Sequence, residues 1–432
     1  MKKVIIIGAN QNGIFAAYRF LKLGFDVVVY EKKNEADVSY NWTDDIDPGV
    51  FEKIGIAMPD SSCYFPKKSW AFVNPAETVV LSLAGSQETD ISIWRRPLNK
   101  YLKSLLPENF IINYNTEVEK LIIKDNKVCG VVVCDKEESA DLVIDASGVM
   151  SKFRASLPSS FNIQQNPDPE ELFIVTRTFY KHNENVEMPK ETNKAYLLHN
   201  GEKGISWCIT TDDEVDILIG RVGNLTSESE NNALADLQKD NKILSTNKIK
   251  GGDRCTIPVR YPLSKMVADG YVAIGDAAFM TIPMMGSGVA AGLLAVHFLA
   301  EVIAKDDSTS VENLWNYQVE FVKNHNAFYG IDVLKRWLLK AQAKDIDFLF
   351  EKGILNQKVM AGGTGGEMKL GIGDILGIIW RGKSRLGLLI NLAKQLPKMD
   401  KVGKLANTIP VEYNKEAVDA WVESIDSFYK NL

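Results

Sequence analysis

The first thirty residues combine short apolar runs with a helical pattern. Residues 4–7 and 27–30 are continuous runs rich in β-branched side chains, which is typical of parallel strands buried on both faces. Between them, apolar residues recur with helical spacing from Ile14 to Leu21, and Gly24 stands where a helix would end. We therefore predict a strand, a helix and a second strand.

The rest of the chain shows two strand-rich stretches and then helical patterns. Short apolar runs within 109–144 predict a β-meander, and several more between 173 and 222 predict a second sheet. Residues 271–274 form another buried-strand pattern, and a long apolar helix is predicted at 288–304. From 310 to 350 apolar residues recur every three to four positions, which predicts further helices.

The turn after the first strand carries a glycine motif. It runs Gly8-Ala9-Asn10-Gln11-Asn12-Gly13, which matches a dinucleotide-binding G-x-G-x-x-G turn except that Asn10 replaces the middle glycine. Asparagine tolerates a positive φ better than most residues, so we expect the turn to be preserved. Glu31 follows the second strand, where an acidic side chain can accept hydrogen bonds from a ribose. These features predict dinucleotide binding; an ordinary tight turn without a ligand is the alternative.

Composition and charge narrow the function further. The 432 residues are 45% hydrophobic, enough for more than one simple domain, and the net charge of −6 opposes binding to nucleic acid. The five cysteines form no CxxC pair and have no metal-ligand spacing, so we predict no disulfide framework and no metal site. The first apolar run ends at Gly8 and the 288–304 run is shorter than a membrane span, so we expect a cytoplasmic protein without an export signal.

Two later segments extend the dinucleotide pattern. The strand at 142–144 leads into Asp145-Ala146-Ser147-Gly148, followed by Ser151 and Arg154. The strand at 271–274 leads into Gly275-Asp276-Ala277-Ala278 and then Pro283-Met284-Met285-Gly286-Ser287-Gly288. With the segment from Gly8 to Glu31, these motifs make the chain resemble the FAD-dependent oxidoreductases with the p-hydroxybenzoate hydroxylase type of fold, most closely the geranylgeranyl reductase-like branch. Taken alone, Gly-Asp-Ala-Ala is a common strand-to-helix turn capped by Asp276.

The resemblance implies an α/β (α+β) fold class in which a Rossmann-like FAD-binding domain is interleaved with a β-sheet substrate domain and followed by a helical C-terminal region. We assign 1–165 to the first part of the FAD-binding domain, with the meander inserted at about 109–144. The substrate-binding sheet takes 166–255, and the last part of the FAD-binding domain takes 256–310. Residues 311–432 form the helical region.

The same resemblance implies where FAD is held. Asp276 would bind the ribityl chain, Val118 would contact adenine through its backbone, and Arg96 would lie near the phosphates or the ring. Gly286 and Gly288 would let backbone approach the flavin beside the positive end of the following helix. The full cofactor-binding set is Gly8, Asn10, Asn12, Gly13, Glu31, Lys32, Arg96, Val118, Gly275, Asp276, Gly286 and Gly288. For Arg96, a solvated arginine at a helix start is the alternative.

The substrate is expected against the second sheet. In the reductase branch an aromatic, proline-rich strand lines a lipid pocket; here Trp207 is kept but the proline and most aromatics are missing. Trp207 could line an apolar pocket or be ordinary core. The four histidines form no catalytic constellation, so no catalytic residue is assigned. Cys63 or Cys208 could donate a proton.

Residues 375–404 combine large apolar side chains with seven lysines and arginines. Such a segment could touch an anionic membrane surface peripherally; packing against the body is the alternative. Gly382 and Gly387 are expected to interrupt a long helix there. The glycine-rich stretch at 361–366 lacks the Gly-Lys-Ser/Thr ending of a phosphate loop and is predicted to be a connector.

Three functions remain open. The first is an FAD-dependent oxidoreductase that reduces carbon–carbon double bonds of an apolar, isoprenoid-type small molecule or lipid. An FAD-dependent monooxygenase or hydroxylase is the alternative, because the same three segments serve both chemistries. A nonenzymatic FAD-binding lipid carrier would also agree with the missing constellation. No second nucleotide-binding unit is visible, so NAD(P)H would bind transiently, or a reduced electron-carrier protein would supply electrons.

Overall fold

The structure is a computed structural model that describes residues 1–83, 90–357 and 372–432, so the connector predicted at 361–366 lies outside the described residues. Its first sheet has the strand order β18-β19-β12-β1-β2-β8, and every neighbouring pair is parallel except β18–β19. The strands are β1 (Lys3–Ile7), β2 (Asp26–Tyr30), β8 (Ile112–Asn113), β12 (Leu142–Asp145), β18 (Val267–Ala268) and β19 (Tyr271–Ala273). This is the predicted Rossmann-like layer.

Helices cover this sheet and carry its core. The helix α1 (Gln11–Lys22) packs against α6 (Val289–Lys305), which corresponds to the apolar helix predicted at 288–304. On α1, Ile14 and Ala17 are fully buried, as the helical spacing requires. A third helix, α3 (Arg95–Ser104), also contacts α1. The N-terminal ends of α1 and α6 lie together at one edge of the parallel sheet.

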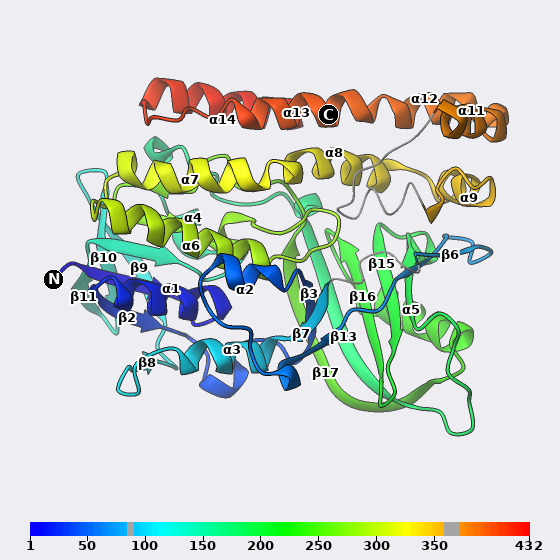
Figure 1. Cartoon of the computed structure of the whole chain (residues 1–432), viewed down its shortest axis with the longest axis horizontal. Coiled ribbons are helices and arrows are strands. Elements are labelled where there is room, and N and C mark those ends of the chain that lie inside the picture. Colours follow the sequence, from blue (N-terminus) through cyan, green and yellow to red (C-terminus); the bar gives the residue numbers. More distant parts are fainter. Residues whose placement is uncertain (84–89, 358–371) are drawn as a thin grey trace.

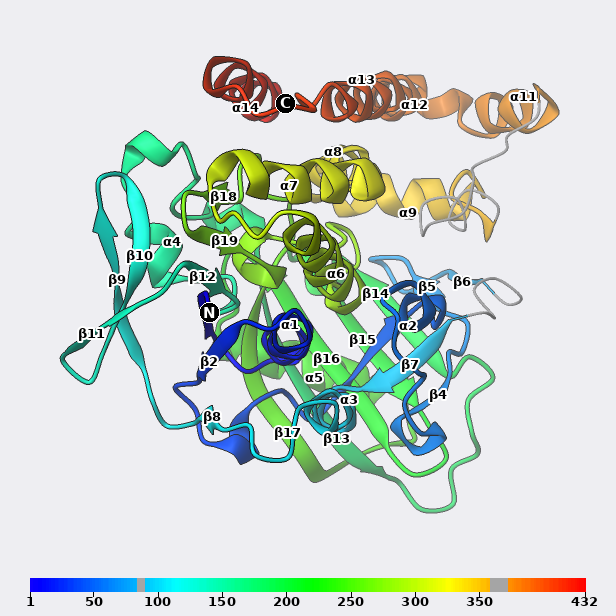
Figure 2. The same cartoon turned by 60° about the vertical axis from the view of Figure 1, so that its left-hand side comes forward.

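The predicted meander is an antiparallel sheet of β9 (Val118–Lys124), β10 (Lys127–Val133) and β11 (Lys136–Ser139). It is shorter than the predicted range 109–144, because the first and last runs of that range are β8 and β12 of the parallel sheet. Asp125 and Asn126, which join the first two strands, both have positive φ values of 49° and 58°. A two-residue hairpin turn of type I′ requires a positive φ at both central residues, because only then does the turn match the right-handed twist of the two strands. Figure 2 shows the meander at the end of the molecule opposite to β4–β6.

The second sheet has seven strands in the order β17-β13-β16-β15-β14-β5-β6. They are β5 (Ala71–Val73), β6 (Val80–Ser82), β13 (Leu172–His182), β14 (Asn193–Leu197), β15 (Gly204–Thr210), β16 (Val215–Val222) and β17 (Leu244–Pro258). The strands predicted between 173 and 222 are present. The helix α5 (Ser227–Asp240) packs on one face of this sheet.

Two features of this sheet go beyond the predicted domain limits. β5 and β6 come from a segment assigned to the FAD-binding domain, and β14 pairs with β5 in parallel. β17 extends to Pro258 and was not predicted, because most of its side chains are polar or partly exposed. A small sheet of β3 (Thr43–Ile46), β7 (Ile91–Trp94) and β4 (Tyr64–Pro66) also comes from the first part of the chain.

The C-terminal region is helical, as predicted. Figure 1 shows α7, α8 and α9 as one layer above the sheets, and α11 to α14 as an outer layer. These helices are α7 (Val311–His325), α8 (Ala327–Lys340), α9 (Ala343–Glu351), α11 (Ile372–Arg381), α12 (Leu386–Ala393), α13 (Gln395–Asn407) and α14 (Lys415–Lys430). A long helix is interrupted between Arg381 and Leu386, as expected; Gly382 follows the end of α11, whereas Gly387 is the second residue of α12.

Candidate cofactor and substrate site

The glycine turn brings backbone unusually close to a neighbouring strand. Gly8 has a φ of +104°, and a Cβ atom there would lie 2.6 Å from the Ala146 carbonyl oxygen. At Gly13 a Cβ atom would lie 1.9 Å from the Gly8 carbonyl oxygen. Both positions therefore require glycine, because any larger residue would force the strand, the turn and α1 apart.

Asn10 does not play the part expected from the sequence. Its φ is −73°, so the prediction that it adopts a positive φ is wrong; it is the N-cap of α1. Its side-chain oxygen accepts from the backbone N–H groups of Asn12 (3.0 Å) and Gly13 (3.2 Å). Its amide donates to the Ala146 carbonyl oxygen at 2.7 Å. The turn is preserved. However, the Asn10 carboxamide already accepts from two backbone N–H groups that could otherwise face a pyrophosphate.

Glu31 is held against the same turn. It is only 9% exposed, and its carboxylate accepts from the backbone N–H groups of Ala9 and Lys33, each at 2.9 Å. Because a carboxylate has about four acceptor positions, two bonds leave capacity for ribose hydroxyls. The end of β2 therefore presents an oriented acceptor beside the turn, as a dinucleotide site requires.

The second and third segments are joined by two buried polar contacts. The Arg154 guanidinium donates to the Ala277 carbonyl oxygen at 2.5 Å and to the Val149 carbonyl oxygen at 2.7 Å. The Tyr271 hydroxyl donates to the Asp145 carboxylate at 2.8 Å. Segments that are more than a hundred residues apart in sequence thus meet at one edge of the parallel sheet, where α/β folds bind ligands.

A cavity of about 410 Å³ opens at this edge. Most of the predicted cofactor residues line it, namely Gly8, Asn10, Asn12, Glu31, Lys32, Val118, Asp276, Gly286 and Gly288. Gly13 and Gly275 lie next to it without lining it; a Cβ atom on Gly275 would be 2.3 Å from the Asn12 amide nitrogen. The cavity wall thus contains contributions from the first and third motifs, and Ala146 to Gly148 add the second.

Arg96 is exposed and does not line the cavity; its Nε atom donates to the Ser39 carbonyl oxygen at 3.4 Å. The preceding residue, Arg95, does line it and forms an ion pair with Asp44. Burial acts to lower the pKa of Arg95, but the Asp44 carboxylate outweighs burial and raises it, so the guanidinium stays charged. The guanidinium also lies 5.9 Å from the Tyr40 ring and 5.6 Å from the Trp42 ring.

Asp276 also lines the cavity. Burial raises the pKa of Asp276, and the neighbouring Arg95 opposes that shift. Gly288 is the N-cap of α6, and a Cβ atom there would lie 2.8 Å from the Thr281 side chain and 2.9 Å from the Met280 carbonyl oxygen. The N-terminal end of α6 therefore borders the cavity and offers partial positive charge to an anionic group.

The residues present fit FAD. The Asn12 side-chain oxygen is buried and has no partner within the described chain, and Asn12 lines the cavity. That oxygen faces α6, because a Cβ atom on Gly292 would lie 2.5 Å from it, so it is not the atom that a ligand would meet. The fit rests instead on Gly8, which lines the cavity without a side chain, so that a pyrophosphate can approach the backbone of the turn. Glu31 and Asp276, which both line the cavity, would supply acceptors for the two sugar portions of the cofactor.

The second sheet closes the cavity on the opposite side. Cys255, Thr256 and Ile257 of β17 line it. Behind them lies a mainly aromatic cluster that includes Trp42, Phe179, Trp94, Phe173 and Trp207. Trp207, the predicted substrate residue, lies in this cluster 5.4 Å from the Trp70 ring, and its indole N–H is buried without a partner among the described residues.

Cys255 and Tyr40 are further cavity residues that were not predicted. Burial raises the pKa of the Cys255 thiol to about 12, and burial also raises the pKa of the Tyr40 hydroxyl, with Cys255 close to it. Both groups therefore carry their proton at neutral pH. The thiols named from the sequence lie elsewhere: Cys63 is buried near the first domain's small sheet, and Cys208 faces α5.

The fold and cavity together define the class of FAD-dependent oxidoreductases in which a Rossmann-like domain is interleaved with a substrate sheet. Comparisons with known proteins narrow this class. No family model matches the chain. The chain is 22% identical to the digeranylgeranylglycerophospholipid reductase of Sulfolobus acidocaldarius. The match covers 98% of this chain and 96% of that protein.

Solved structures agree with this fold. A geranylgeranyl bacteriochlorophyll reductase-like protein from Thermoplasma acidophilum covers 91% of this chain and 100% of its own, with a TM-score of 0.71 and 18% identity. PqsL, a probable FAD-dependent monooxygenase from Pseudomonas aeruginosa, covers 84% of this chain and 99% of its own, with a TM-score of 0.55 and 15% identity. The predicted fold class and the resemblance to the geranylgeranyl reductase-like branch are confirmed.

Proposed function

We propose that this chain is an FAD-dependent oxidoreductase that reduces carbon–carbon double bonds of an apolar, isoprenoid-type substrate. The observation that carries this proposal is the cavity itself, which has polar dinucleotide-binding residues on one side and a wall backed by aromatic residues on the other. The similarity to a lipid reductase along 98% of the chain supports the same reading.

The chain's own residues would divide the work as follows. FAD, when bound and reduced, supplies the hydride. Glu31 and Asp276 hold the sugar portions of the cofactor, and the end of α6 borders the flavin half. The aromatic cluster around Trp42 and Phe179 backs the wall formed by β17 and would exclude water from that side.

Saturating a double bond also requires a proton at the second carbon. Cys255 faces the cavity from the substrate sheet and is protonated at neutral pH, so we assign it as the proton donor. Bulk solvent would return a proton to the thiolate after each turnover. Tyr40, on the cofactor side, is the other protonated group in reach of the cavity.

A monooxygenase is the second candidate, because PqsL shares the fold. The test is to photoreduce the FAD-loaded protein without oxygen and to add a geranylgeranyl lipid or, separately, air. Reoxidation by the lipid with formation of a saturated product supports the proposed reductase. Fast reoxidation by oxygen alone favours the monooxygenase, and slow reoxidation by both favours a lipid carrier. A protein that cannot be loaded with FAD refutes all three.

We further propose that the protein contacts membranes peripherally through residues 375–404. Among the described residues, no helix has the length and apolar content to cross a bilayer. The 375–404 segment carries seven basic residues and one acidic residue. Its exposed large apolar side chains are Leu376, Ile379, Trp380, Leu386, Ile390 and Leu396, and Trp380 is 70% exposed.

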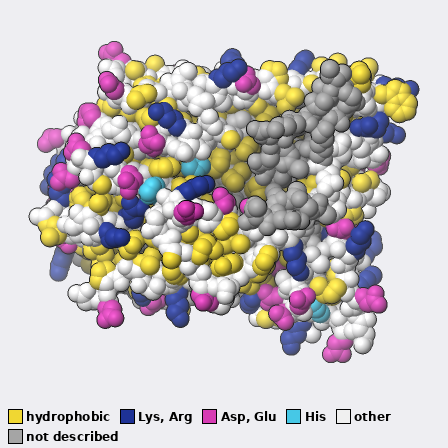
Figure 3. Space-filling model, in the orientation of Figure 1, with side chains coloured by type: hydrophobic (Ala, Val, Ile, Leu, Met, Phe, Trp, Pro, Cys, Tyr) yellow, Lys and Arg dark blue, Asp and Glu magenta, His cyan; other side chains and the backbone are white. Residues whose placement is uncertain are grey.

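Figure 3 shows apolar and basic side chains next to each other at the end of the molecule that carries α11. The other face of this segment packs on the body through Ile378, Leu388 and Leu389. Apolar side chains that insert between lipids, beside lysines that attract anionic headgroups, are the features of an interfacial helix. A lipid substrate would then be taken from the membrane by a cytoplasmic enzyme. We propose that NAD(P)H or a reduced electron-carrier protein supplies the electrons.

A further inference from the structure

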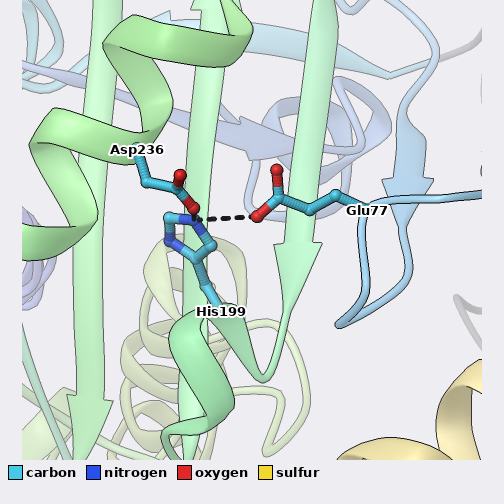
Figure 4. Close-up of side chains that lie close together, drawn as sticks. All are labelled: Glu77, His199 and Asp236. Carbon is cyan, nitrogen blue, oxygen red and sulfur yellow. Dashed lines mark hydrogen bonds and ion pairs between the residues drawn. The ribbon is translucent and has the colours of Figure 1, made fainter.

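Three residues far apart in sequence meet behind the substrate sheet. Figure 4 shows His199, Glu77 and Asp236 pointing toward one another. His199 begins the short helix η5 (His199–Gly201) after β14, Glu77 lies between β5 and β6, and Asp236 lies on α5. Trp207 faces the aromatic cluster, so its neighbour Ser206, the partner of His199, faces α5. The group is therefore separated from the cofactor cavity by the sheet.

The spacing of the three side chains suits a small cation. The His199 Nε2 atom is 3.2 Å from Asp236 Oδ2 and 3.7 Å from Glu77 Oε1. The nearest ligand atoms of all three residues lie within 4.8 Å of one another. A tetrahedral Zn²⁺ with bonds of about 2.0–2.1 Å holds its ligand atoms roughly 3.3 Å apart. Small side-chain movements would bring the three atoms to that geometry.

His199 is prepared as a ligand. It is 1% exposed, and its Nδ1 atom lies 2.9 Å from the Ser206 hydroxyl. This contact fixes the ring so that Nε2 faces the two carboxylates, as the outer hydrogen bond of a metal-binding histidine does.

The charges around the group leave room for a cation. Two carboxylates, those of Glu77 and Asp236, approach the same ring nitrogen of His199. Asp240 adds negative charge and is paired with Lys194 at 2.7 Å. Of the nearby cations, Arg221 lies 3.3 Å from the Glu202 carboxylate, and Lys239 is on the same helix as Asp236.

We propose that Glu77, His199 and Asp236 form a binding site for one divalent ion of the Zn²⁺ type, with water as a fourth ligand. One nitrogen and two carboxylate oxygens are ligands that zinc accepts in proteins. The ion would tie α5 and the β5–β6 turn to the sheet that carries the substrate wall. This inference is independent of the proposed function, because the group lies on the other face of the sheet.

The test uses the full chain, loaded with FAD and stripped of metal with a chelator. All proteins carry Cys134→Ser, since Cys134 is an exposed thiol that could bind zinc by itself. We expect isothermal titration with ZnCl₂ to give one site per chain and added zinc to raise the melting temperature by several degrees. Glu77→Gln and Asp236→Asn should each weaken zinc binding at least tenfold. The matched control Glu187→Gln, an exposed residue on another loop, should bind as tightly as the parent.

Loss of binding and loss of folding can be told apart. Without metal, Glu77→Gln removes a repelling carboxylate, so we expect the metal-free variant to melt no lower than the metal-free parent. A parent protein that binds no zinc would overturn the proposal. So would a zinc affinity that is the same in Glu77→Gln, Asp236→Asn and the control.

Discussion

The Asn10 side-chain amide donates a 2.7 Å hydrogen bond to the carbonyl oxygen of Ala146, 136 residues further along the chain. The same side chain caps α1 through its oxygen. A residue that stands in place of a motif glycine thus both closes the turn and fastens it to the end of β12.

Asn10→Asp should separate the cap from the cofactor. The carboxylate can still accept from the backbone of Asn12 and Gly13, but it loses the bond to Ala146 and places a negative charge beside the pyrophosphate site. We expect FAD affinity to fall at least tenfold in a flavin-fluorescence titration. In Asn10→Gly the cap is lost, and urea unfolding should show a loss of about 1–2 kcal/mol with a smaller effect on FAD. Equal FAD affinity in Asn10→Asp and the parent would contradict this account.

Glu31→Gln removes the charge and one of two acceptor oxygens that bind the backbone of Ala9 and Lys33. Because a hydrogen bond to a charged group contributes about 1.5–3 kcal/mol, we expect at least a tenfold weaker binding of FAD. The control is Glu108→Gln, which is exposed and lies away from the cavity. Unchanged FAD binding in Glu31→Gln would show that the ribose is held by another group.

The neighbouring arginines form a matched pair. Arg95→Met leaves the half-buried Asp44 without its partner, so we expect a loss of about 3 kcal/mol in the free energy of unfolding and weaker FAD binding. Arg96→Met should change either quantity little, because the Arg96 side chain is exposed. Chemical denaturation followed by flavin absorbance measures both. The reverse result would restore the role that the sequence assigned to Arg96.

Cys255→Ala tests the proton donor. We expect lipid-dependent reoxidation of the reduced flavin to slow by about a hundredfold, the lower range for general acid catalysis. In the parent, the rate should stay level from neutral pH to about pH 10, because the raised pKa of Cys255, about 12, keeps the thiol protonated. Tyr40→Phe, which keeps the ring that stacks on Trp42, is the comparison. A larger effect of Tyr40→Phe would transfer the role to the tyrosine.

The high pKa of Cys255 also bears on stability. An ordinary thiol ionises near pH 8.5 in the unfolded chain, whereas the buried thiol stays protonated until about pH 12. The unfolded state therefore binds fewer protons between these values, and this thiol makes the free energy of unfolding fall as pH rises through that window. Cys255→Ala should flatten that part of the stability profile in urea titrations between pH 8 and pH 10.

Membrane contact can be tested by sedimentation with vesicles. Trp380→Ser combined with Ile390→Ser should lower partitioning to anionic vesicles at least tenfold, because both side chains are exposed and apolar. Vesicles without anionic lipid, or high salt, should also weaken binding. Val411→Ser removes an exposed apolar residue outside this segment and is the control. Equal partitioning of the double variant and the control would contradict the proposed contact.

Much of the cofactor half follows from local patterns. The run from β1 through Gly8 and α1 to Glu31 could be predicted because strand, turn and helix each depend on residues within a few positions. The same holds for the meander, whose Asp125-Asn126 turn has the left-handed backbone that its residue types tolerate. The resemblance then supplied Asp276, Gly286 and Gly288, which line the cavity.

The substrate side of the cavity was harder to predict from the sequence. Cys255 lies on a strand of mostly polar residues, and β17 is a strand because it pairs along its length with β13. Nothing in its own composition signals that pairing. Likewise, the sequence does not show which of Arg95 and Arg96 faces the cavity. In the structure α3 begins at Arg95, and Arg95 is the one that lines the cavity. The aromatic cluster gathers residues from β13 and β15 and from the segment around Trp42, which no short motif connects.

By itself, the sequence determined the dinucleotide unit, the hairpins of the meander and the helical C-terminal region, because hydrophobic periodicity and turn chemistry act over short distances. The resemblance to a known family then implied that the dinucleotide is FAD. Only the tertiary structure decided that Asn10 caps a helix and binds Ala146, that Arg95 rather than Arg96 enters the cavity, and that Glu77, His199 and Asp236 meet. Those relationships depend on which strands pair and which faces are buried. Burial is a property of the whole packed chain rather than of any segment of it.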